Sequence, residues 1–415
     1  MKNEDQTINF NGVRLNDLTK YIESNCKLQL QLVQNNIASP KLFIQGKPGI
    51  GKSDIVKTFC EQNGYALVVK YMSNMLYEMM TGLPIAETLK VGAEAQWSKP
   101  NLFSFTNFAY KPENDQPFDI NKTPIVLFID DVHLCDKNTQ KFLFQLLTYR
   151  SINDYTLPNN VVIILAGNRI IDKAGAHPIP APICNRLIFI DAICSSDDWV
   201  KNFAIKNHLR HDIITYIKQY GDSVLIGEPV ESLPWPSPRS WTYLSQSLDN
   251  IKNCNLTDLQ IISNGLIGTD AANKFIAYSK LFSRWDFDVY INQKIELVFK
   301  EFDKAFNKDK DPIVIYSIIN AATAYMLNIF EHNNKQLTKE VKKVVEFVYK
   351  IYTHFLDEQY INYKPFIITG INYIIDVKNN EEINDILDYF IDQMENDTDK
   401  DNQMYELLQS VFSVE

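Results

Sequence analysis

The stretch GKPGIGKS, Gly46 to Ser53, follows a short apolar run, KLFIQ (residues 41–45), and precedes a helical pattern over residues 52–63. Its three glycines allow the backbone to turn N–H groups inward around an anion, and the following helix adds the positive end of its dipole. A strand, a glycine-rich turn and a helix in this order form a cradle for phosphate groups. We therefore predict an α/β fold built around a phosphate-binding loop.

The loop matches the pattern G-x-x-x-x-G-K-[ST], which is typical of nucleotide-binding P-loops. Lys52 is placed to reach the β- and γ-phosphates, and the hydroxyl of Ser53 is placed to bind Mg²⁺. The alternative is a glycine-rich turn with an incidental lysine, and the flanking strand and helix argue against it. The predicted nucleotide-binding residues are Gly46, Lys47, Pro48, Gly49, Ile50, Gly51, Lys52, Ser53 and Asp54.

Four further β-rich runs follow the loop and alternate with helical stretches, after a helical pattern over residues 13–36. Continuous apolar strands alternating with helices predict a parallel sheet covered on both faces. The runs are ALVVKYM (66–72), PIVLFID (124–130), NVVIILAG (160–167) and LIFIDAI (187–193). The sequence thus predicts a P-loop NTPase fold with a parallel five-stranded sheet flanked by helices.

Two aspartates stand at the end of the run PIVLFID (124–130): Asp130 is its last residue and Asp131 follows it. Carboxylates at the end of a buried strand cost free energy unless a cation or a reaction requires them. A P-loop needs an acid on a neighbouring strand to hold Mg²⁺, so we predict that Ser53 and Asp130 form the metal site. Asp131 would then polarise the attacking water. A surface turn would explain one aspartate, but not its coincidence with a P-loop.

Beyond about residue 195 the strand signal fades and a helical pattern continues, with an acidic tail near MENDTDKDNQ. We predict three parts: residues 1–195, an α/β nucleotide-binding domain with an N-terminal helix; 196–283, a helical lid; and 284–415, a helical C-terminal extension. The extension either enlarges the lid or serves as an adaptor for a partner. The six cysteines contain no C-x-x-C pair, so we expect small buried apolar side chains and neither a zinc site nor disulfides.

Several segments resemble AAA+ ATPases of the MoxR-like and dynein-related branch, in particular its phage and bacterial members. The resemblance covers roughly residues 10–280. It is carried by the loop, by the aspartate pair and by the segments MTGLPIAETLKVGAEAQWSKPNLF (80–103), VVIILAGNRIIDKAGAHPIPAPICNRLIFID (161–191), PWPSPRSWTYLSQSL (234–248) and ISNGLIGTDAANKFIAYSKLF (262–282).

This resemblance implies roles for three more residues. Asn168 would orient the attacking water, Arg186 would be the finger that a neighbouring subunit inserts into the nucleotide site, and Arg239 would tie the helical lid to the nucleotide. The alternatives are an Asn chosen for its turn, a surface salt-bridge Arg and a helix-capping Arg, and Arg169 competes with Arg186. With Lys52 and Asp131 these form the predicted catalytic set.

Asp131 departs from the resemblance, because most relatives place glutamate there. A side chain one methylene shorter holds its carboxylate further back, and a misplacement of ~1 Å can cost on the order of a hundredfold in rate. The lysine, the asparagine and the two arginines nevertheless favour an active enzyme over a site that only binds.

The resemblance implies an ATP- and Mg²⁺-dependent hydrolase that assembles as a hexameric ring and remodels or activates a partner protein, as a chaperone does. Members of this branch often act with a partner that carries a von Willebrand factor A domain. A polar N-terminus and the lack of an uninterrupted apolar segment of roughly 18 residues lead us to expect a cytoplasmic protein, or one in the host cytoplasm if viral, without a membrane segment.

Two other classes of function stay open. One is a nucleic-acid machine of the helicase-loader or restriction-complex type, although a net charge of −10 argues against a chain that mainly coats nucleic acid. The other is a nucleotide-gated scaffold with negligible hydrolysis, for which Asp131 is the hint.

Overall fold

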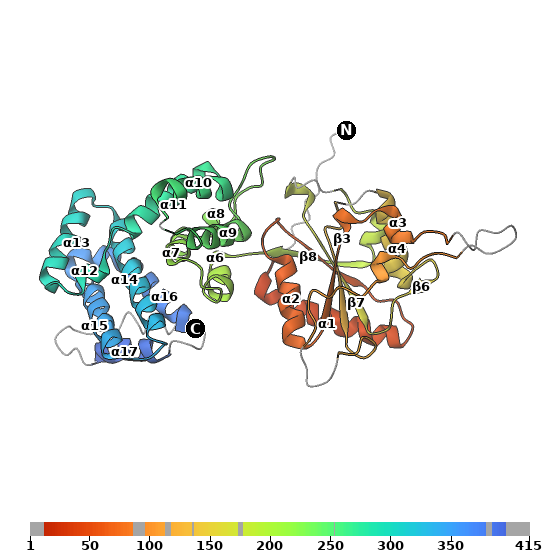
Figure 1. Cartoon of the computed structure of the whole chain (residues 1–415), viewed down its shortest axis with the longest axis horizontal. Coiled ribbons are helices and arrows are strands. Elements are labelled where there is room, and N and C mark those ends of the chain that lie inside the picture. Colours follow the sequence, from red (N-terminus) through yellow and green to blue (C-terminus); the bar gives the residue numbers. More distant parts are fainter. Residues whose placement is uncertain are drawn as a thin grey trace. The chain divides into compact units, whose positions relative to one another are not determined.

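The structure is a computed structural model that describes residues 12–85, 96–112, 118–134, 137–172, 177–252, 254–378 and 384–395. Contacts between Cα atoms divide the chain into two compact units (Figure 1). The first comprises the described residues up to Ser195 together with Glu228–Leu233 and Ser237–Arg239, and the second comprises the rest.

The first unit contains a six-stranded parallel sheet in the order β1-β8-β2-β7-β4-β3. The prediction of a parallel sheet flanked by helices is confirmed, with one strand more than expected. The extra strand pairs Val13 and Arg14 with the strand β8, whereas the sequence predicts helix from residue 13. The strands are β1 (Val13–Arg14), β2 (Lys41–Gln45), β3 (Ala66–Tyr71), β4 (Ile125–Asp130), β7 (Val161–Gly167) and β8 (Leu187–Ile193).

Helices cover both faces of this sheet (Figure 1). The longer ones are α1 (Leu15–Gln34), α2 (Lys52–Asn63) and α4 (Lys137–Tyr149), and the short ones are α3 (Tyr77–Thr81) and α5 (Ala181–Cys184). The 3₁₀ turns are η1 (Met72–Asn74), η3 (Asn101–Phe103) and η4 (Ile170–Asp172), and a small hairpin pairs β5 (Ser151–Ile152) with β6 (Tyr155–Thr156).

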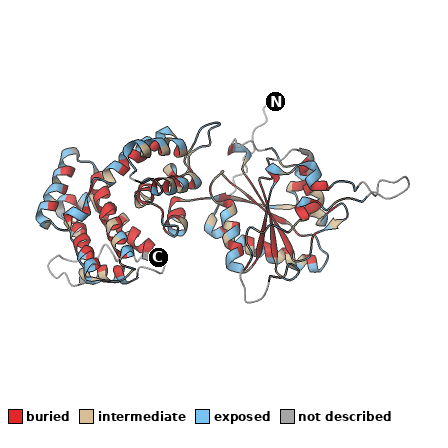
Figure 2. Cartoon of the chain, viewed as in Figure 1, coloured by how far each residue is buried: buried red, intermediate tan, exposed pale blue. Residues whose placement is uncertain are grey.

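The core lies between the central strands and these helices (Figure 2). Every residue of β4 and β7 is buried, which is why both read as nearly continuous apolar runs. One face packs on α4 through Leu143, Leu146 and Leu147. On α1 the buried amide of Gln29 accepts from the N–H of Ile163 at 2.9 Å and donates to its carbonyl at 2.7 Å, so neither group is left unpaired.

The second unit is helical throughout its described residues. Its helices are α6 (Ser196–Trp199), α7 (His211–Tyr220), α8 (Asp222–Leu225), α9 (Pro238–Asp249, whose first residues group with the first unit), α10 (Leu256–Ile267), α11 (Thr269–Phe282), α12 (Phe287–Tyr290), α13 (Ile295–Asp309), α14 (Pro312–His332), α15 (Lys339–His354), α16 (Lys364–Lys378) and α17 (Asn384–Glu395), with a π-helical turn η5 (Val200–Ala204) and a 3₁₀ segment η6 (Glu358–Tyr363).

Residues from both predicted helical parts, 196–283 and 284–415, share one core in this unit. The hydroxyls of Tyr278 and Tyr316 both donate to Thr215 at 2.8 Å, to its hydroxyl and its carbonyl respectively. Lys218 and Asp376 form a buried ion pair between α7 and α16. The predicted acidic tail lies outside the described residues, apart from the end of α17.

Among the described residues, α14 is long and apolar enough to cross a bilayer by length and composition alone. However, 78% of its most apolar window is buried within the protein, which is the pattern of a core helix. Cys26, Cys60 and Cys194 are buried, as expected, whereas Cys184 is only half-buried and Cys254 is exposed, and neither fits that prediction. Cys135 lies outside the described residues.

Candidate nucleotide-binding site

The glycine-rich loop joins the end of β2 to the start of α2, as the sequence predicts. A Cβ on Gly46 would lie 2.6 Å from the carbonyl oxygen of Ala192, so any larger residue would clash with backbone. Gly49 and Gly51 have φ values of 77° and 103°, in the left-handed region that glycine adopts without strain. Since the first N–H groups of α2 have no acceptor within the helix, the loop and the helix start together suit an anion.

Lys52 lies buried beside this loop, with 7% of its surface exposed. Its Nζ donates to the carbonyls of Gly46 and Lys47 at 2.9 Å and to Oδ1 of Asn168 at 3.0 Å. Burial lowers the pKa of Lys52 to about 8, against the opposing effect of the nearby Asp130 carboxylate. A buried ammonium held by three neutral oxygens retains a strong preference for an anionic ligand.

Ser53 and Asp130 meet at the carboxyl edge of the sheet. The Ser53 hydroxyl donates to Oδ2 of Asp130 at 2.6 Å, and the other carboxylate oxygen accepts the N–H of Asp131 at 2.9 Å. Hydroxyl and carboxylate oxygens are the donors that Mg²⁺ prefers, and it binds through few protein ligands plus substrate phosphates. Among the described residues, no group of three or more His, Cys, Asp or Glu side chains is arranged to hold a metal.

Asp131 has an unusual backbone for a residue other than glycine, with φ of 56°. Its Oδ2 accepts a long hydrogen bond, 3.4 Å, from the hydroxyl of Ser73, which follows β3. Burial and the adjacent Asp130 carboxylate raise the pKa of Asp131. Strained backbone of this kind persists where the surrounding structure enforces it, often at functional sites. The Asp131 carboxylate therefore lies at the carboxyl edge of the sheet, in contact with Ser73 in the segment that follows β3.

Asn168 sits between the loop and Asp130, because β7 lies between β2 and β4. Its backbone N–H donates to the ring of His133, 2.8 Å from Nε2. His133 is 2% exposed, and burial together with the nearby Lys52 lowers its pKa to about 4, so the ring is neutral and able to accept. A Cβ on Gly167 would lie 2.0 Å from Nδ1 of this ring.

His133 is a positioning residue that sequence reasoning missed. The available signals were a histidine shortly after the aspartate pair and a glycine at the end of the next long strand. These two residues lie far apart in the sequence and come into contact only because β4 pairs with β7.

Arg239 also reaches the loop. Its backbone N–H donates to the carbonyl of Gly49 at 3.2 Å, and the buried Ser237 side chain packs beside the same glycine. Its guanidinium has no hydrogen-bond partner within the described part of the chain, and it is close enough to lower the pKa of both Lys52 and Asp131. This cation is therefore available to a ligand at the loop.

Two other loop residues turn outward from this centre. Lys47 forms an ion pair at 2.6 Å with the exposed Glu228, and the side chain of Asp54 is exposed on the first turn of α2.

Arg186 lies elsewhere. It directly precedes β8, and its carbonyl accepts from the N–H of Lys41, the first residue of β2. Both strands run toward the loop, so Arg186 sits at the amino edge of the sheet, roughly 20 Å from the carboxyl edge for strands of this length. Its side chain lies 4.1 Å from the ring centre of Phe144 and donates to the Thr148 hydroxyl at 2.6 Å. It cannot serve the site of its own chain.

Arg169, the competing arginine, follows Asn168 at the carboxyl edge. It makes two hydrogen bonds to Asp172, at 2.8 and 2.9 Å, and a longer one to Asp191 at 3.4 Å. This guanidinium is fully occupied by carboxylates of its own chain.

Numbered along the chain without β1, the five core strands lie in the order 5-1-4-3-2, with the loop after the first. This order, the loop and the acid at the tip of the third strand define a P-loop NTPase fold of the AAA+ type. No protein-family model and no curated protein matches the sequence.

Among solved structures, the chain is similar to RuvB of Thermotoga maritima. One structure of a RuvB mutant is 14% identical, with a TM-score of 0.33 over 62% of this chain and 68% of that one. The structure titled as the Holliday junction branch migration motor is 13% identical, with a TM-score of 0.31 over the same shares. Likeness at this level says nothing about activity, and the fold assignment rests on the strand order and the loop of this chain.

Proposed function

We propose that this chain is an AAA+ ATPase of the MoxR-like branch, which hydrolyses ATP at subunit interfaces of a ring and uses the cycle to remodel a partner protein. One observation carries the proposal. Lys52, Ser53, Asp130 and Asn168 meet at one edge of the sheet, whereas Arg186, the expected finger, lies at the opposite edge. A site divided in this way is complete only when a second subunit supplies the arginine.

The residues at the loop edge have separable tasks. The loop N–H groups and Lys52 would hold the β- and γ-phosphates, and Ser53 and Asp130 would hold Mg²⁺, which supplies charge neutralisation between the phosphate oxygens. Asn168, fixed by His133, would orient a water through its amide. Asp131, with its raised pKa, would accept the proton of that water. Arg239 would join the phosphates to the start of α9.

In the proposed ring, Arg186 of one subunit would act at the nucleotide site of its neighbour. A guanidinium brought against the γ-phosphate offsets charge that develops in the transition state, an effect worth roughly 10³–10⁵ in rate for comparable fingers. The side chain is only half-buried, so it is accessible from outside the subunit.

The proposal is tested by phosphate release and sedimentation. The protein should release phosphate from ATP, and a non-hydrolysable ATP analogue should convert it to a larger ring species. Lys52→Ala should abolish both because the phosphates lose their buried cation. Phosphate release that stays at the parental rate in Lys52→Ala, or a protein that stays monomeric with the analogue, would refute the assignment. The client, including a partner with a von Willebrand factor A domain, stays a prediction of the resemblance.

A further inference from the structure

The helical unit contains a cavity that the nucleotide site does not use. Its volume is about 1030 Å³, at the upper end of the range for ligand pockets, roughly 300–1,000 Å³. Its walls come from the segment before α7, from α7 and α11, and from α12, α14 and α16. All of these elements belong to the second unit, so the cavity is a property of that unit alone.

The buried side of the cavity is polar but internally satisfied. Asp212 accepts from Arg210 at 2.9 and 3.1 Å and from the Ser279 hydroxyl at 2.9 Å. Arg210 also reaches Asp249 at 3.4 Å. The positive charge of Arg210 is therefore offset by two carboxylates, and this side of the cavity offers no free cation to an anionic ligand.

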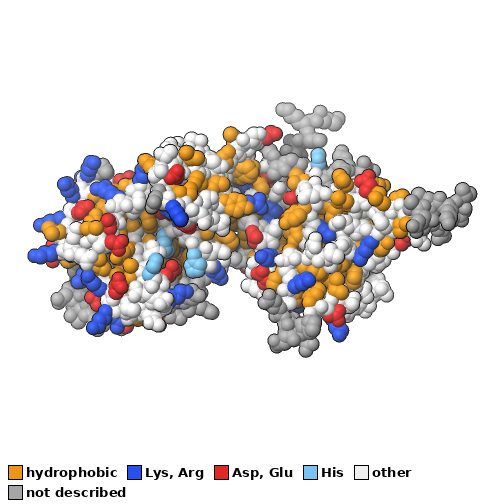
Figure 3. Space-filling view, viewed as in Figure 1, with side chains coloured by type: hydrophobic (Ala, Val, Ile, Leu, Met, Phe, Trp, Pro, Cys, Tyr) orange, Lys and Arg blue, Asp and Glu red, His pale blue; other side chains and the backbone are white. Residues whose placement is uncertain are grey.

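Carboxylates outnumber cations around the rest of the lining. Its acidic residues are Asp286, Asp288 and Glu331, its lysines are Lys206 and Lys335, and His208 lies 3.8 Å from Glu331. All three acids are exposed. In Figure 3 histidine side chains lie beside acidic ones on the visible face of the helical unit. The lining thus favours a positively charged ligand that arrives from solvent.

Aromatic rings complete the lining. Phe287 and Tyr325 stack with ring centres 5.8 Å apart, and Phe282, Trp285 and Tyr373 also contribute to the lining. Phe282 and Tyr325 are half-buried, whereas the other three rings are buried behind them. Aromatic faces attract ammonium and guanidinium groups, and they also pack against an alkyl stem. Rings next to carboxylates are the chemistry that recognises a lysine or arginine side chain along its whole length.

We propose that this cavity binds a basic peptide segment of a partner protein, with an arginine or lysine side chain inserted between the aromatic wall and the carboxylates of Asp288 and Glu331. The alkyl stem would pack on Phe287 and Tyr325, and the cationic head would lie at the acidic rim. This proposal goes beyond nucleotide hydrolysis and stands if the nucleotide site proves inactive.

The test uses the full chain and three labelled peptides that differ only in charge. The first carries two arginines among glycine and alanine, the second replaces them with neutral citrulline, and the third replaces them with glutamate. Fluorescence anisotropy should show binding of the arginine peptide, and both other peptides should bind roughly tenfold more weakly or worse. Equal binding of the arginine and citrulline peptides, tighter binding of the glutamate peptide or no binding of any peptide would overturn the proposal.

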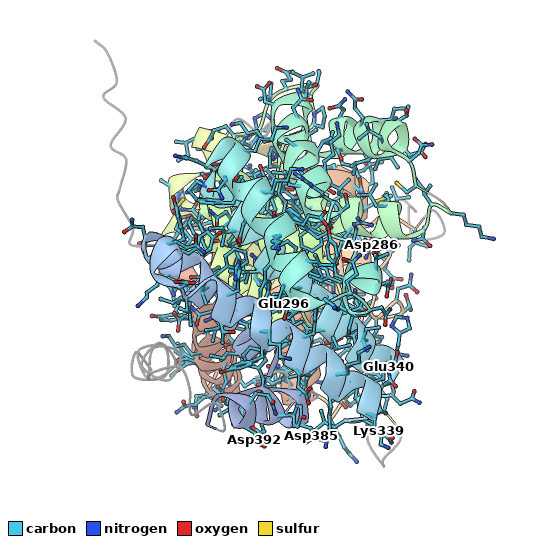
Figure 4. The ribbon with its side chains drawn as sticks, turned by 90° about the vertical axis from the view of Figure 1, so that its left-hand side faces the viewer. Asp286, Glu296, Lys339, Glu340, Asp385 and Asp392 are labelled. Atoms are coloured by element: carbon cyan, nitrogen blue, oxygen red, sulfur yellow. The ribbon has the colours of Figure 1, made fainter. Side chains whose placement is uncertain are left out.

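Matched variants locate the binding. Asp288→Asn combined with Glu331→Gln removes two lining carboxylates and should weaken the arginine peptide about tenfold, as expected for the loss of two partly exposed ion pairs. Glu296→Gln combined with Asp385→Asn removes the same charge at exposed positions on α13 and α17 outside the lining. Figure 4 labels both control positions and the lining residue Asp286.

The control pair should keep the parental affinity, and circular dichroism should show the same melting curve for both pairs. An equal loss in both pairs would indicate a general charge effect and overturn the site. Spermidine serves as a last probe, because tighter binding of this free polyamine than of the peptide would overturn the peptide assignment.

Discussion

The Oγ of Ser53 lies 2.6 Å from Oδ2 of Asp130, although 77 positions separate the two residues in the chain. The pairing of β2, β7 and β4 brings together the two oxygens that a P-loop needs for Mg²⁺. The hydroxyl donates a hydrogen bond to the carboxylate.

Asp130→Asn should therefore separate nucleotide binding from its metal dependence. We expect the variant to bind ATP, while Mg²⁺ strengthens that binding about tenfold less than in the parent, because an amide is a weaker ligand for a hard cation. Titration of a fluorescent ATP analogue with and without Mg²⁺ measures this. Glu61→Gln, an exposed change further along the helix α2, is the control, and an unchanged Mg²⁺ effect in Asp130→Asn would exclude the metal role.

Arg186→Ala should bind ATP and lose hydrolysis by about 10³-fold or more, because we propose that this side chain serves the site of a neighbouring subunit. The sharper test mixes it with Lys52→Ala. Mixed rings place an intact loop from one variant beside an intact Arg186 from the other, so phosphate release should reappear although each variant alone is inactive. Arg169→Ala is the control for this experiment. Because the Arg169 guanidinium is bound by Asp172 and Asp191 of its own chain, any activity lost in this variant should not return on mixing with Lys52→Ala. If mixing restores nothing, the trans role is wrong.

Asp131→Glu should hydrolyse ATP faster but unfold more easily. The longer side chain brings the carboxylate about 1 Å nearer to the γ-phosphate, which is worth up to on the order of a hundredfold. The left-handed backbone at this position tolerates aspartate better than most residues, so glutamate should cost roughly 1 kcal/mol. Phosphate release and urea unfolding measure the two effects, Asp131→Asn is the inactive control, and a slower glutamate variant would contradict the prediction.

Lys52 should make nucleotide affinity depend on pH. Its pKa is about 8 because of burial, and a phosphate ligand favours the charged form, so binding above this pH requires uptake of a proton. The dissociation constant of ATP should rise up to about tenfold between roughly pH 7 and pH 9. Lys52→Arg keeps its charge throughout and should show a flat profile, whatever its absolute affinity. A flat profile in the parent would show that the amine is not buried as described.

His133 should make the fold sensitive to mild acid. Its pKa is about 4 in the folded chain against about 6.5 in an unfolded one, so the unfolded state binds the proton first as pH falls. The stabilisation is complete above about pH 6.5 and is lost toward about pH 4, at up to about 1.4 kcal/mol per pH unit. His133→Gln keeps an acceptor for the Asn168 N–H without titrating. Its unfolding free energy should decline less steeply over this range, and parallel slopes would contradict the assignment.

The sequence alone predicted most of what is local. Apolar runs mark the five core strands, and three glycines and a lysine mark the loop and the start of α2. The residues that give each signal lie close together in the sequence, and the bounds of these elements were predicted closely. Asp130 was predicted as well, because an acid at a buried strand end is costly in any fold. The short strand at Val13 was missed, because two residues are too few to show a hydrophobic period and because the strand forms only by pairing with β8.

Tertiary structure decided what depends on pairing between distant segments. The contact of His133 with Asn168 exists only because β4 and β7 are neighbours, and the sequence does not mark that adjacency. The same sheet places Arg186 at the far edge from the loop, so this side chain does not reach the candidate nucleotide site of its own chain. In the helical unit, the buried pair of Lys218 and Asp376 spans 158 positions, a separation that no local pattern encodes.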